Sequence, residues 1–288
     1  AMDIFDRASE TLGIDMKKLC FQEGETELKK TENTQPSILT TSIAILEVLK
    51  LRGIMPEIAA GLSLGEYTAL VASNAICFEE AVDIVKKRGK FMQEAVPYGE
   101  GTMAAVMGLD RNEVMECLQM ASGYGVVEAA NFNCPSQIVI TGQVRAVEKA
   151  KEMLKNKGAR KIIPLPVSAP FHSSMLRSAG KRLSEELRKV KFNDMNIPVV
   201  SNVNAQIIKD KYEIKNLLIE QLSSSVLWED SIRNMIDLGV NTFIEVGPGK
   251  TLTAFVKKIN KDVFVYNVEN IETLDRTINS IRERLECS

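Results

Sequence analysis

A serine flanked by glycines, Gly-Leu-Ser-Leu-Gly at residues 61–65, is the stretch whose residue types and spacing best suit covalent chemistry. The preceding residues 56–61 have the composition of a short buried strand, and residues 64–73 have that of a helix. At such a strand-to-helix turn the serine is exposed in a strained conformation, and flanking glycines avoid clashes with neighbouring backbone. The pattern predicts that Ser63 is a nucleophile and that the N–H of Leu64 donates to the oxyanion of a tetrahedral intermediate. A plain turn of small residues is the alternative interpretation.

The only histidine of the chain, His172, lies in a proline-containing segment, residues 164–174. A lone histidine is most often a surface or structural residue. Paired with a serine at a sharp turn, it becomes the obvious general base for that serine. The second ring nitrogen of such a base needs an acceptor, and because no acid is clearly positioned for this, we expect a backbone carbonyl to serve.

A basic run at residues 85–90, Val-Lys-Lys-Arg-Gly-Lys, contains Arg88. Such a run usually forms a solvated helix face. The alternative is that Arg88 turns inward while the lysines remain in water, because a planar guanidinium can hold a carboxylate through two parallel hydrogen bonds. Both interpretations stay open at the level of sequence.

The composition excludes several classes of protein. The 288 residues contain 36 Lys and Arg against 38 Asp and Glu, which gives a net charge of −2 and no overall positive field for nucleic acid. No apolar run is long enough to span a membrane, and residues 1–13 suit an amphipathic helix better than a signal peptide. Five scattered cysteines without a Cys-x-x-Cys pair argue against a metal site or disulfide framework, and they favour reduced thiols in a cytoplasmic protein.

Strand and helix patterns alternate around these residues. Further apolar strands are predicted at residues 197–203, 242–246 and 263–268, long helices at residues 37–52 and 79–96, and a polar loop at residues 24–34. Apolar strands that alternate with helices imply an α/β fold, with a mostly parallel sheet covered by helices in a hydrolase-like core.

Residues 101–165 have a different pattern. Strands at 102–108, 126–131, 137–142 and 161–165 and helices at 111–121 and 144–157 follow the order βαββαβ. This is the order of a ferredoxin-like unit, which can close as its own small domain. We therefore expect a discontinuous α/β domain of residues 1–99 and 167–288, with an inserted ferredoxin-like α+β domain of residues 100–166.

Several stretches resemble the malonyl-CoA:acyl-carrier-protein transacylase family of bacterial type II fatty-acid synthesis. They run in the family's order along nearly the whole chain: GLSLGEYTALV around Ser63, KKRGKFMQEAVP around Arg88, NFNCPSQIVITG at residues 131–142, PLPVSAPFHSSM around His172, SNV at residues 201–203 and EVGPGKTL at residues 245–252. The family also has a ferredoxin-like small domain where the strand and helix pattern predicts one.

The resemblance implies a role for each matching residue. Ser63 would accept the malonyl group from malonyl-CoA as an ester, His172 would be the general base and then the acid, and Arg88 would hold the malonyl carboxylate. Gln221 matches the position whose main-chain carbonyl orients the histidine, and Leu64 would give an oxyanion-hole N–H. The phosphopantetheine thiol of an acyl carrier protein, from fatty-acid or polyketide synthesis, would then attack the ester with no metal or dissociable cofactor. We further expect a cytoplasmic monomer that binds neither nucleic acid nor a membrane.

Two features differ from the family pattern. The residue before the nucleophile is commonly histidine in the family and is Leu62 here. The family also begins with a strand ending in a G-Q-G-x-Q loop, whose glutamine N–H is the second oxyanion donor, and no such stretch precedes Ala1. We therefore expect either a truncated chain or an impaired form, because loss of one oxyanion donor lowers the rate on the order of 100- to 1000-fold.

Two other functions fit part of the pattern. One is an α/β serine hydrolase or thioesterase, although neither an acid between the serine and the histidine nor an HGGG-like loop is evident. The other is a truncated, non-catalytic form that binds carrier protein or CoA. For docking of an acidic carrier protein, the candidate basic residues are Lys86, Lys87, Lys90, Arg160 and Lys161.

Overall fold

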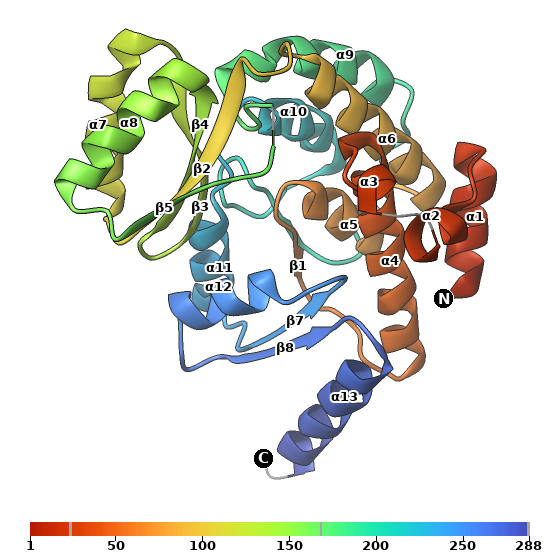
Figure 1. Cartoon of the computed structure of the whole chain (residues 1–288). Coiled ribbons are helices and arrows are strands. Elements are labelled where there is room, and N and C mark those ends of the chain that lie inside the picture. The colour runs from red at the N-terminus through yellow and green to blue at the C-terminus, as the bar shows by residue number, and fades with distance from the viewer. Residues whose placement is uncertain (23–24, 168, 287–288) are drawn as a thin grey trace.

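Helices dominate the N-terminal part of the computed structural model, which describes residues 1–22, 25–167 and 169–286 (Figure 1). The first elements are α1 (Met2–Leu12), α2 (Met16–Phe21), α3 (Glu25–Leu28), α4 (Thr31–Leu51), β1 (Ala59–Ala60), α5 (Leu64–Ala72) and α6 (Phe78–Glu94). Their apolar faces share one core, in which Leu39, Leu70 and Val85 are fully buried.

Strands and helices are mixed in the rest of the chain. The elements there are β2 (Gly101–Met107), α7 (Arg111–Ala121), the short 3-10 helix η1 (Ser122–Tyr124), β3 (Val127–Cys134), β4 (Gln137–Gln143), α8 (Val144–Lys157), β5 (Lys161–Pro164), the 3-10 helix η2 (Ser174–Leu176), α9 (Arg177–Leu187), β6 (Val199–Val200), α10 (Lys211–Gln221), α11 (Trp228–Asp237), β7 (Thr242–Val246), α12 (Thr251–Ile259), β8 (Phe264–Val268) and α13 (Ile271–Glu286). The α/β class predicted from the sequence is therefore confirmed.

The sequence predicts a loop over residues 24–34. Residue 24 lies outside the described residues, and for the rest of the segment the prediction is wrong. α3 lies within the segment, and α4 already begins at Thr31. The polar start of α4 packs against α6: a Cβ on Gly89 would come within 2.5 Å of the Thr31 carbonyl oxygen, and Gln35 is buried. Polarity here reflects contact with another helix, which a polar pattern does not distinguish from exposure to water.

The strands of the described ranges form two short, separate parallel pairs, besides one isolated parallel bridge between Asn131 and Val226. β1 pairs with β6, and β7 pairs with β8. The structure thus differs from the prediction of one mostly parallel sheet, and the strands predicted at residues 56–61 and 197–203 are shorter than expected. The ladder ends after Ala60 because the chain turns there and bonds to the side chain of Asn202 instead of to a strand.

The largest sheet is antiparallel, with the strand order β3-β4-β2-β5. Helices α7 and α8 cover one of its faces (Figure 1). The buried residues of its core all fall within residues 104–154, and Ile140 and Leu154 are fully buried. All four strands predicted in this region are present, but β3 continues through two bulges to Cys134, past the end predicted at residue 131.

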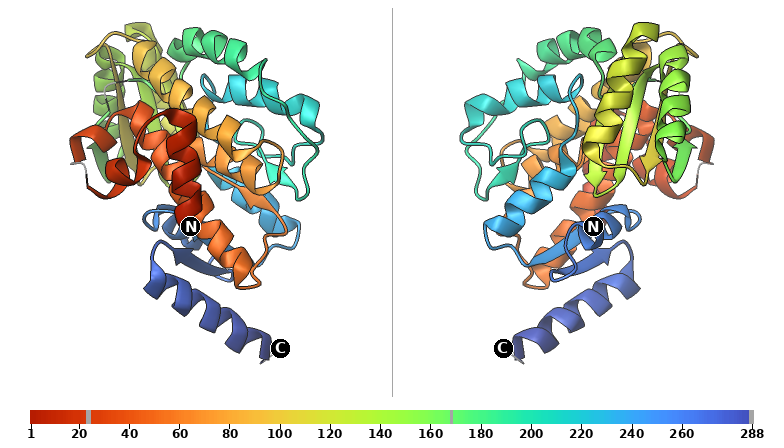
Figure 2. Two further views of the ribbon diagram at one scale, coloured as in Figure 1. Left: turned by 90° about the vertical axis from the view of Figure 1, so that its right-hand side faces the viewer. Right: turned by 90° about the vertical axis from the view of Figure 1, so that its left-hand side faces the viewer.

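The antiparallel sheet lies beside the helical part of the molecule, and α13 extends away from the rest in every view (Figures 1 and 2). The start of α5, the middle of α6, the segment before η2 and the end of α10 meet between these two parts. No helix in the described part of the chain is long and apolar enough to cross a membrane.

Candidate active site

Ser63 lies at a sharp turn between β1 and α5. Its backbone has φ 54° and ψ −103°, a conformation that residues with side chains rarely adopt. A Cβ on Gly61 would lie 2.0 Å from the carbonyl group of Gly65, so only glycine fits at Gly61. A Cβ on Gly65 would meet nothing within 4 Å, which corrects the expectation that both glycines are needed to avoid clashes.

The side chain of Asn202 braces this turn from both sides. Its Oδ1 accepts a hydrogen bond from the Ser63 N–H at 2.6 Å, and its Nδ2 donates to the Gly61 carbonyl at 2.8 Å. Asn202 is fully buried, so these bonds form away from competing water. The strained serine is therefore held by a side chain that comes from a distant part of the sequence.

Leu64 is the first residue of α5, so its N–H lies at the turn that holds Ser63. The first N–H groups of a helix have no partner within the helix, and the next two bond back to the turn, Gly65 to Leu62 and Glu66 to Ser63. No backbone acceptor within residues 1–22, 25–167 and 169–286 bonds to the Leu64 N–H. This N–H can therefore donate to an oxyanion that forms beside the serine.

His172 contacts the serine directly. Its Nε2 lies 2.7 Å from the Ser63 Oγ, and its Nδ1 lies 2.9 Å from the Gln221 carbonyl oxygen. A carbonyl oxygen can only accept, so Nδ1 carries the proton, and the lone pair of Nε2 faces the serine hydroxyl. This is the protonation state that a general base requires.

Burial and charge keep this histidine neutral. The side chain is only 5% exposed. Loss of hydration is the main cause that lowers the pKa of His172 to about 4, and the nearby Arg88 cation lowers it further, while the hydrogen bonds to the Gln221 and Ser224 backbone oppose the shift. The His172 backbone is also strained, with φ 58°, like that of Ser63.

Arg88 lies inside the protein, although it belongs to a basic run. Its side chain is 1% exposed, and its guanidinium donates to the Ser63 Oγ at 3.0 Å and to the side-chain oxygens of Gln221 and Gln35, each at 2.8 Å. None of these partners is a carboxylate, and no ion pair joins Arg88 to an acid elsewhere in the described residues. Burial lowers the pKa of Arg88 below its usual value, and the cation stacks 5.5 Å from the centre of the Tyr67 ring.

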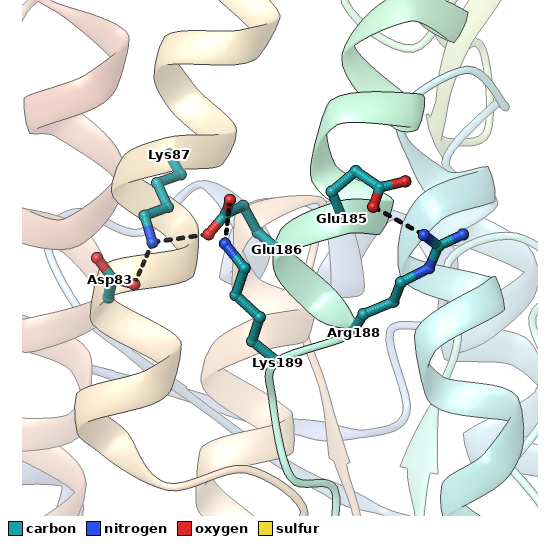
Figure 3. A network of polar contacts seen from close by, with 6 residues as sticks. All are labelled: Asp83, Lys87, Glu185, Glu186, Arg188 and Lys189. Atoms are coloured by element: carbon teal, nitrogen blue, oxygen red, sulfur yellow. Dashed lines mark hydrogen bonds and ion pairs between the residues drawn. The ribbon is translucent and has the colours of Figure 1, made fainter.

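The adjacent lysine takes the other face of α6. Lys87 bonds to Asp83 on its own helix and to Glu186 on α9, each at 2.8 Å (Figure 3). Lys189 joins the same Glu186 carboxylate. The lysine lies at the surface, as the inward-facing alternative for Arg88 requires.

The structure therefore brings together all five residues singled out from the sequence: Ser63, Leu64, Arg88, His172 and Gln221. It adds three more that sequence reasoning missed, namely Gln35, Glu66 and Asn202. A signal existed for Glu66, since it is the one charged residue of the otherwise apolar helix α5, and a buried carboxylate must find partners. Asn202 lies in the SNV stretch at residues 201–203 that resembles the family, although that stretch assigned it no role, and Gln35 has no such signal.

A groove of about 860 Å³ has His172 in its lining. Its walls come from α7, from β3 and from the serine segment at residues 223–225 that follows α10. Glu128 of β3 lines the groove and accepts a hydrogen bond from the Ser174 N–H at 2.7 Å. The histidine therefore borders this groove, whereas Ser63 and Arg88 are not among the residues that line it.

Comparisons with known proteins agree over almost the whole chain. The profile of the Acyl transferase domain family matches residues 1–281. A malonyl CoA-acyl carrier protein transacylase of Bacillus subtilis (strain 168) is 47% identical over 284 residues, which cover 98% of this chain and 90% of that protein.

Solved structures give the same result. The crystal structure of malonyl CoA-acyl carrier protein transacylase from Clostridium perfringens has a TM-score of 0.96 and 50% identity, and the match covers 99% of this chain and 90% of that one. A malonyl-transacylase in complex with a type II PKS acyl-carrier protein has a TM-score of 0.94 and 36% identity, with 96% and 90% covered. With a serine–histidine pair at its centre and matches of this extent, the chain belongs to the acyl transferase domain family and is an acyltransferase.

Proposed function

We propose that this protein transfers a malonyl group from malonyl-CoA to the phosphopantetheine thiol of an acyl carrier protein, through a malonyl ester on Ser63. The observation that carries the proposal is the buried Arg88, which donates to the Ser63 hydroxyl and has no carboxylate partner among the described residues. An acyl group that ends in a carboxylate supplies such a partner. The relatives described above are named for the same transfer, and one is bound to an acyl-carrier protein.

The first half of the reaction acylates the serine. As the Ser63 oxygen attacks the thioester carbon, Nε2 of His172 takes the hydroxyl proton, and its neutral state leaves this nitrogen free to do so. The N–H of Leu64 stabilises the negative charge of the tetrahedral intermediate. The C–S bond then breaks, His172 returns its proton to the CoA sulfur, and malonyl-Ser63 remains.

The second half transfers the acyl group to the carrier protein. After CoA leaves, the pantetheine thiol enters through the groove that His172 lines, and His172 takes the thiol proton. The sulfur attacks the ester carbon, the C–O bond to Ser63 breaks, and the proton passes to the serine oxygen. The Gln221 carbonyl holds the imidazole in one orientation through both halves.

Arg88 accounts for selection of the acyl group. A malonyl carboxylate pairs with the guanidinium fork, whereas an acetyl group leaves the cation buried without an anion. The hydrogen bond from Arg88 to the Ser63 oxygen also stabilises negative charge on the nucleophile. One residue therefore serves both specificity and reactivity in this proposal.

The proposal includes a division into a discontinuous, hydrolase-like α/β domain of residues 1–99 and 167–288 and a ferredoxin-like domain of residues 100–166. The strand order β3-β4-β2-β5 and the separate core of that region support the division. We also propose that the protein is a monomer and that it lies in the cytoplasm, where the free cysteines of the described residues would stay reduced. Lys86, Lys90, Arg160 and Lys161 remain our docking residues for carrier protein, without Lys87, which two carboxylates of its own chain already bind.

A transfer assay tests the proposed function. The protein is mixed with malonyl-CoA and a phosphopantetheine-bearing acyl carrier protein, and the mass of the carrier and the release of free CoA are followed together. We expect malonyl-carrier and free CoA to form in equal amounts, and Ser63→Ala to abolish both. Release of CoA without malonyl-carrier would instead identify a hydrolase, and no release of CoA would identify a non-catalytic binding protein.

A further inference from the structure

Glu66 is a fully buried carboxylate one turn after the nucleophile, and the reaction described above does not use it. Its Oε2 accepts hydrogen bonds from the Gln221 side-chain Nε2 at 2.6 Å and from the Asn202 N–H at 3.1 Å. These two partners are the residues that hold His172 and the turn at Ser63. The carboxylate therefore joins the supports of the site without contacting the reacting atoms.

Gln221 links the base and the cation. Its main-chain oxygen accepts from His172, while its side-chain oxygen accepts from Arg88 at 2.8 Å. Its side-chain Nε2 donates to Glu66 and to the Ser63 carbonyl at 3.0 Å. The main-chain carbonyl of Gln221 thus orients His172, and its side-chain oxygen accepts a hydrogen bond from Arg88.

The chemistry of these partners allows only one orientation of the Gln221 amide. Arg88 has donors and no acceptor, so it needs the amide oxygen, while the Ser63 carbonyl can only accept and needs the NH₂ group. Glu66 strengthens this preference, because its carboxylate forms the shortest of the amide's hydrogen bonds. Without that acceptor, a flipped amide would point its NH₂ group at the guanidinium.

The same arrangement keeps Arg88 available. Glu66 attracts the guanidinium electrostatically, but the two groups form no ion pair within the described ranges, because the Gln221 amide lies between them. A direct ion pair would occupy the fork that a substrate carboxylate needs. The intervening amide supplies an acceptor and leaves the cation without a bound anion.

We propose that Glu66 is a positioning residue that fixes the Gln221 amide and thereby sets the preference of Arg88 for carboxylate-bearing acyl groups. This inference rests on the proposed function, since it concerns selection at the same site. Glu66 acts through hydrogen bonding by an oxygen acceptor, so glutamine can replace it and leucine cannot. Within the described residues, the side chain of Gln221 is the group that hydrogen-bonds to both Glu66 and the cation.

The test compares acylation of Ser63 by malonyl-CoA and by acetyl-CoA in Glu66→Leu, Glu66→Gln and Gln221→Leu. The readout is the ratio of kcat/KM for the two donors, because a merely structural defect lowers both values together and leaves their ratio unchanged. We expect Glu66→Leu and Gln221→Leu to lower the ratio at least tenfold and Glu66→Gln to stay within threefold of the parent. Thr68→Val, on the same helix and with a buried hydroxyl that has no partner in the described residues, is the matched control and should keep the parent ratio.

A double variant completes the test. If Glu66 acts through Gln221, then Glu66→Leu combined with Gln221→Leu lowers the ratio no further than either change alone. An unchanged ratio in Gln221→Leu overturns the proposal even if Glu66→Leu does not fold, and so does a tenfold loss in Glu66→Gln. Failure of the proposed function is distinguishable, since the parent protein itself would then form no malonyl adduct on Ser63.

Discussion

Lys87 and Arg88 are neighbours on α6, yet their surroundings are opposite. The Lys87 side chain is 38% exposed and bonds directly to two carboxylates, those of Asp83 and Glu186 (Figure 3). The Arg88 side chain is buried and bonds to two amide oxygens and a hydroxyl. The carboxylate that acts on its charge, Glu66, is separated from it by the side-chain amide of Gln221. One cation is neutralised by its partners, and the other is not.

The difference separates a structural cation from a functional one. A surface ion pair contributes little to stability because water competes for both charges. A buried cation without a bound anion is costly to the folded state, and such groups occur mainly where a ligand supplies the missing charge. Within two successive residues, the kind of partner distinguishes the two roles better than the residue type.

Among the buried residues, His172→Ala is expected to have the largest effect on the rate of acylation. Without a base at 2.7 Å from the hydroxyl, Ser63 acylation should slow by about 10³-fold, within the range typical of general-base catalysis. Rapid-quench mass spectrometry of the malonyl adduct measures this rate. Ser174→Ala, in the same segment, is the control and should acylate at nearly the parent rate; a loss below tenfold in His172→Ala would exclude histidine as the base.

Arg88→Ala removes the unpaired cation and should produce the next largest effect. We expect kcat/KM for malonyl-CoA to fall about 100-fold, as loss of charge-assisted hydrogen bonds to a carboxylate predicts. The value for acetyl-CoA should fall less, because this donor loses only the hydrogen bond from Arg88 to the Ser63 oxygen and has no carboxylate that pairs with the guanidinium. Equal losses for the two donors would show that Arg88 does not select the acyl group.

Asn202→Leu removes the hydrogen bonds that hold the turn at Ser63, and Asn202 itself has no proposed contact with the substrate. Two buried backbone groups, the Ser63 N–H and the Gly61 carbonyl, lose their partner, which should lower the free energy of unfolding by about 1–3 kcal/mol. We expect roughly a tenfold slower acylation, since a small displacement of the nucleophile is costly to rate. Urea unfolding and acylation kinetics measure the two effects. The exposed Asn204→Leu is the control, and equal destabilisation in both variants would contradict a bracing role.

The dependence of acylation on pH below neutrality tests whether burial lowers the pKa of His172. Because the pKa of His172 is lowered from 6.5 to about 4, the neutral base persists as the pH falls, and kcat/KM should stay nearly constant from pH 7 to 5 and halve near pH 4. The pKa of Glu66, raised by burial to about 7, adds no second limb, because a protonated carboxyl keeps an oxygen that accepts from Gln221. A loss of about 30-fold by pH 5 would instead identify a histidine with an ordinary pKa.

Lys87→Met should have the smallest effect and completes the comparison with Arg88. The loss of two half-exposed ion pairs should change the free energy of unfolding by about 1 kcal/mol or less. Transfer of the malonyl group to carrier protein should stay within twofold of the parent in both kcat and KM. A KM for carrier protein raised more than fivefold would return Lys87 to the docking surface.

The types of the residues and the sequence around them predicted the serine and the histidine of the site. They did not predict the partners that come from distant parts of the chain. A serine at a glycine-flanked turn and a single histidine can be recognised from sequence, because their chemistry is intrinsic to their types. The bonds of Asn202 and Gln35 cannot, since they join residues 139 and 53 positions away in the chain. The inward turn of Arg88 was one of two open alternatives, decided by packing of α6 against α4.

The fold divides in the same way. The antiparallel region of β2 to β5 follows closely from periodicity, because each strand and helix there packs against near neighbours in sequence. Of the short parallel strands, β1 and β6 were predicted too long, since side chains of the site replace ladder partners after Ala60, whereas β7 and β8 match the predicted ranges to within one residue. The polar start of α4 was predicted as a loop, because its polar groups meet α6 and not water.

Intact-protein mass spectrometry after brief exposure to malonyl-CoA or acetyl-CoA tests the central claim most directly, with Ser63→Ala beside the parent protein. The account predicts a malonyl adduct on the parent, little or no acetyl adduct under the same conditions, and neither adduct on Ser63→Ala. An acetyl adduct equal to the malonyl adduct, or a malonyl adduct that survives in Ser63→Ala, would contradict it.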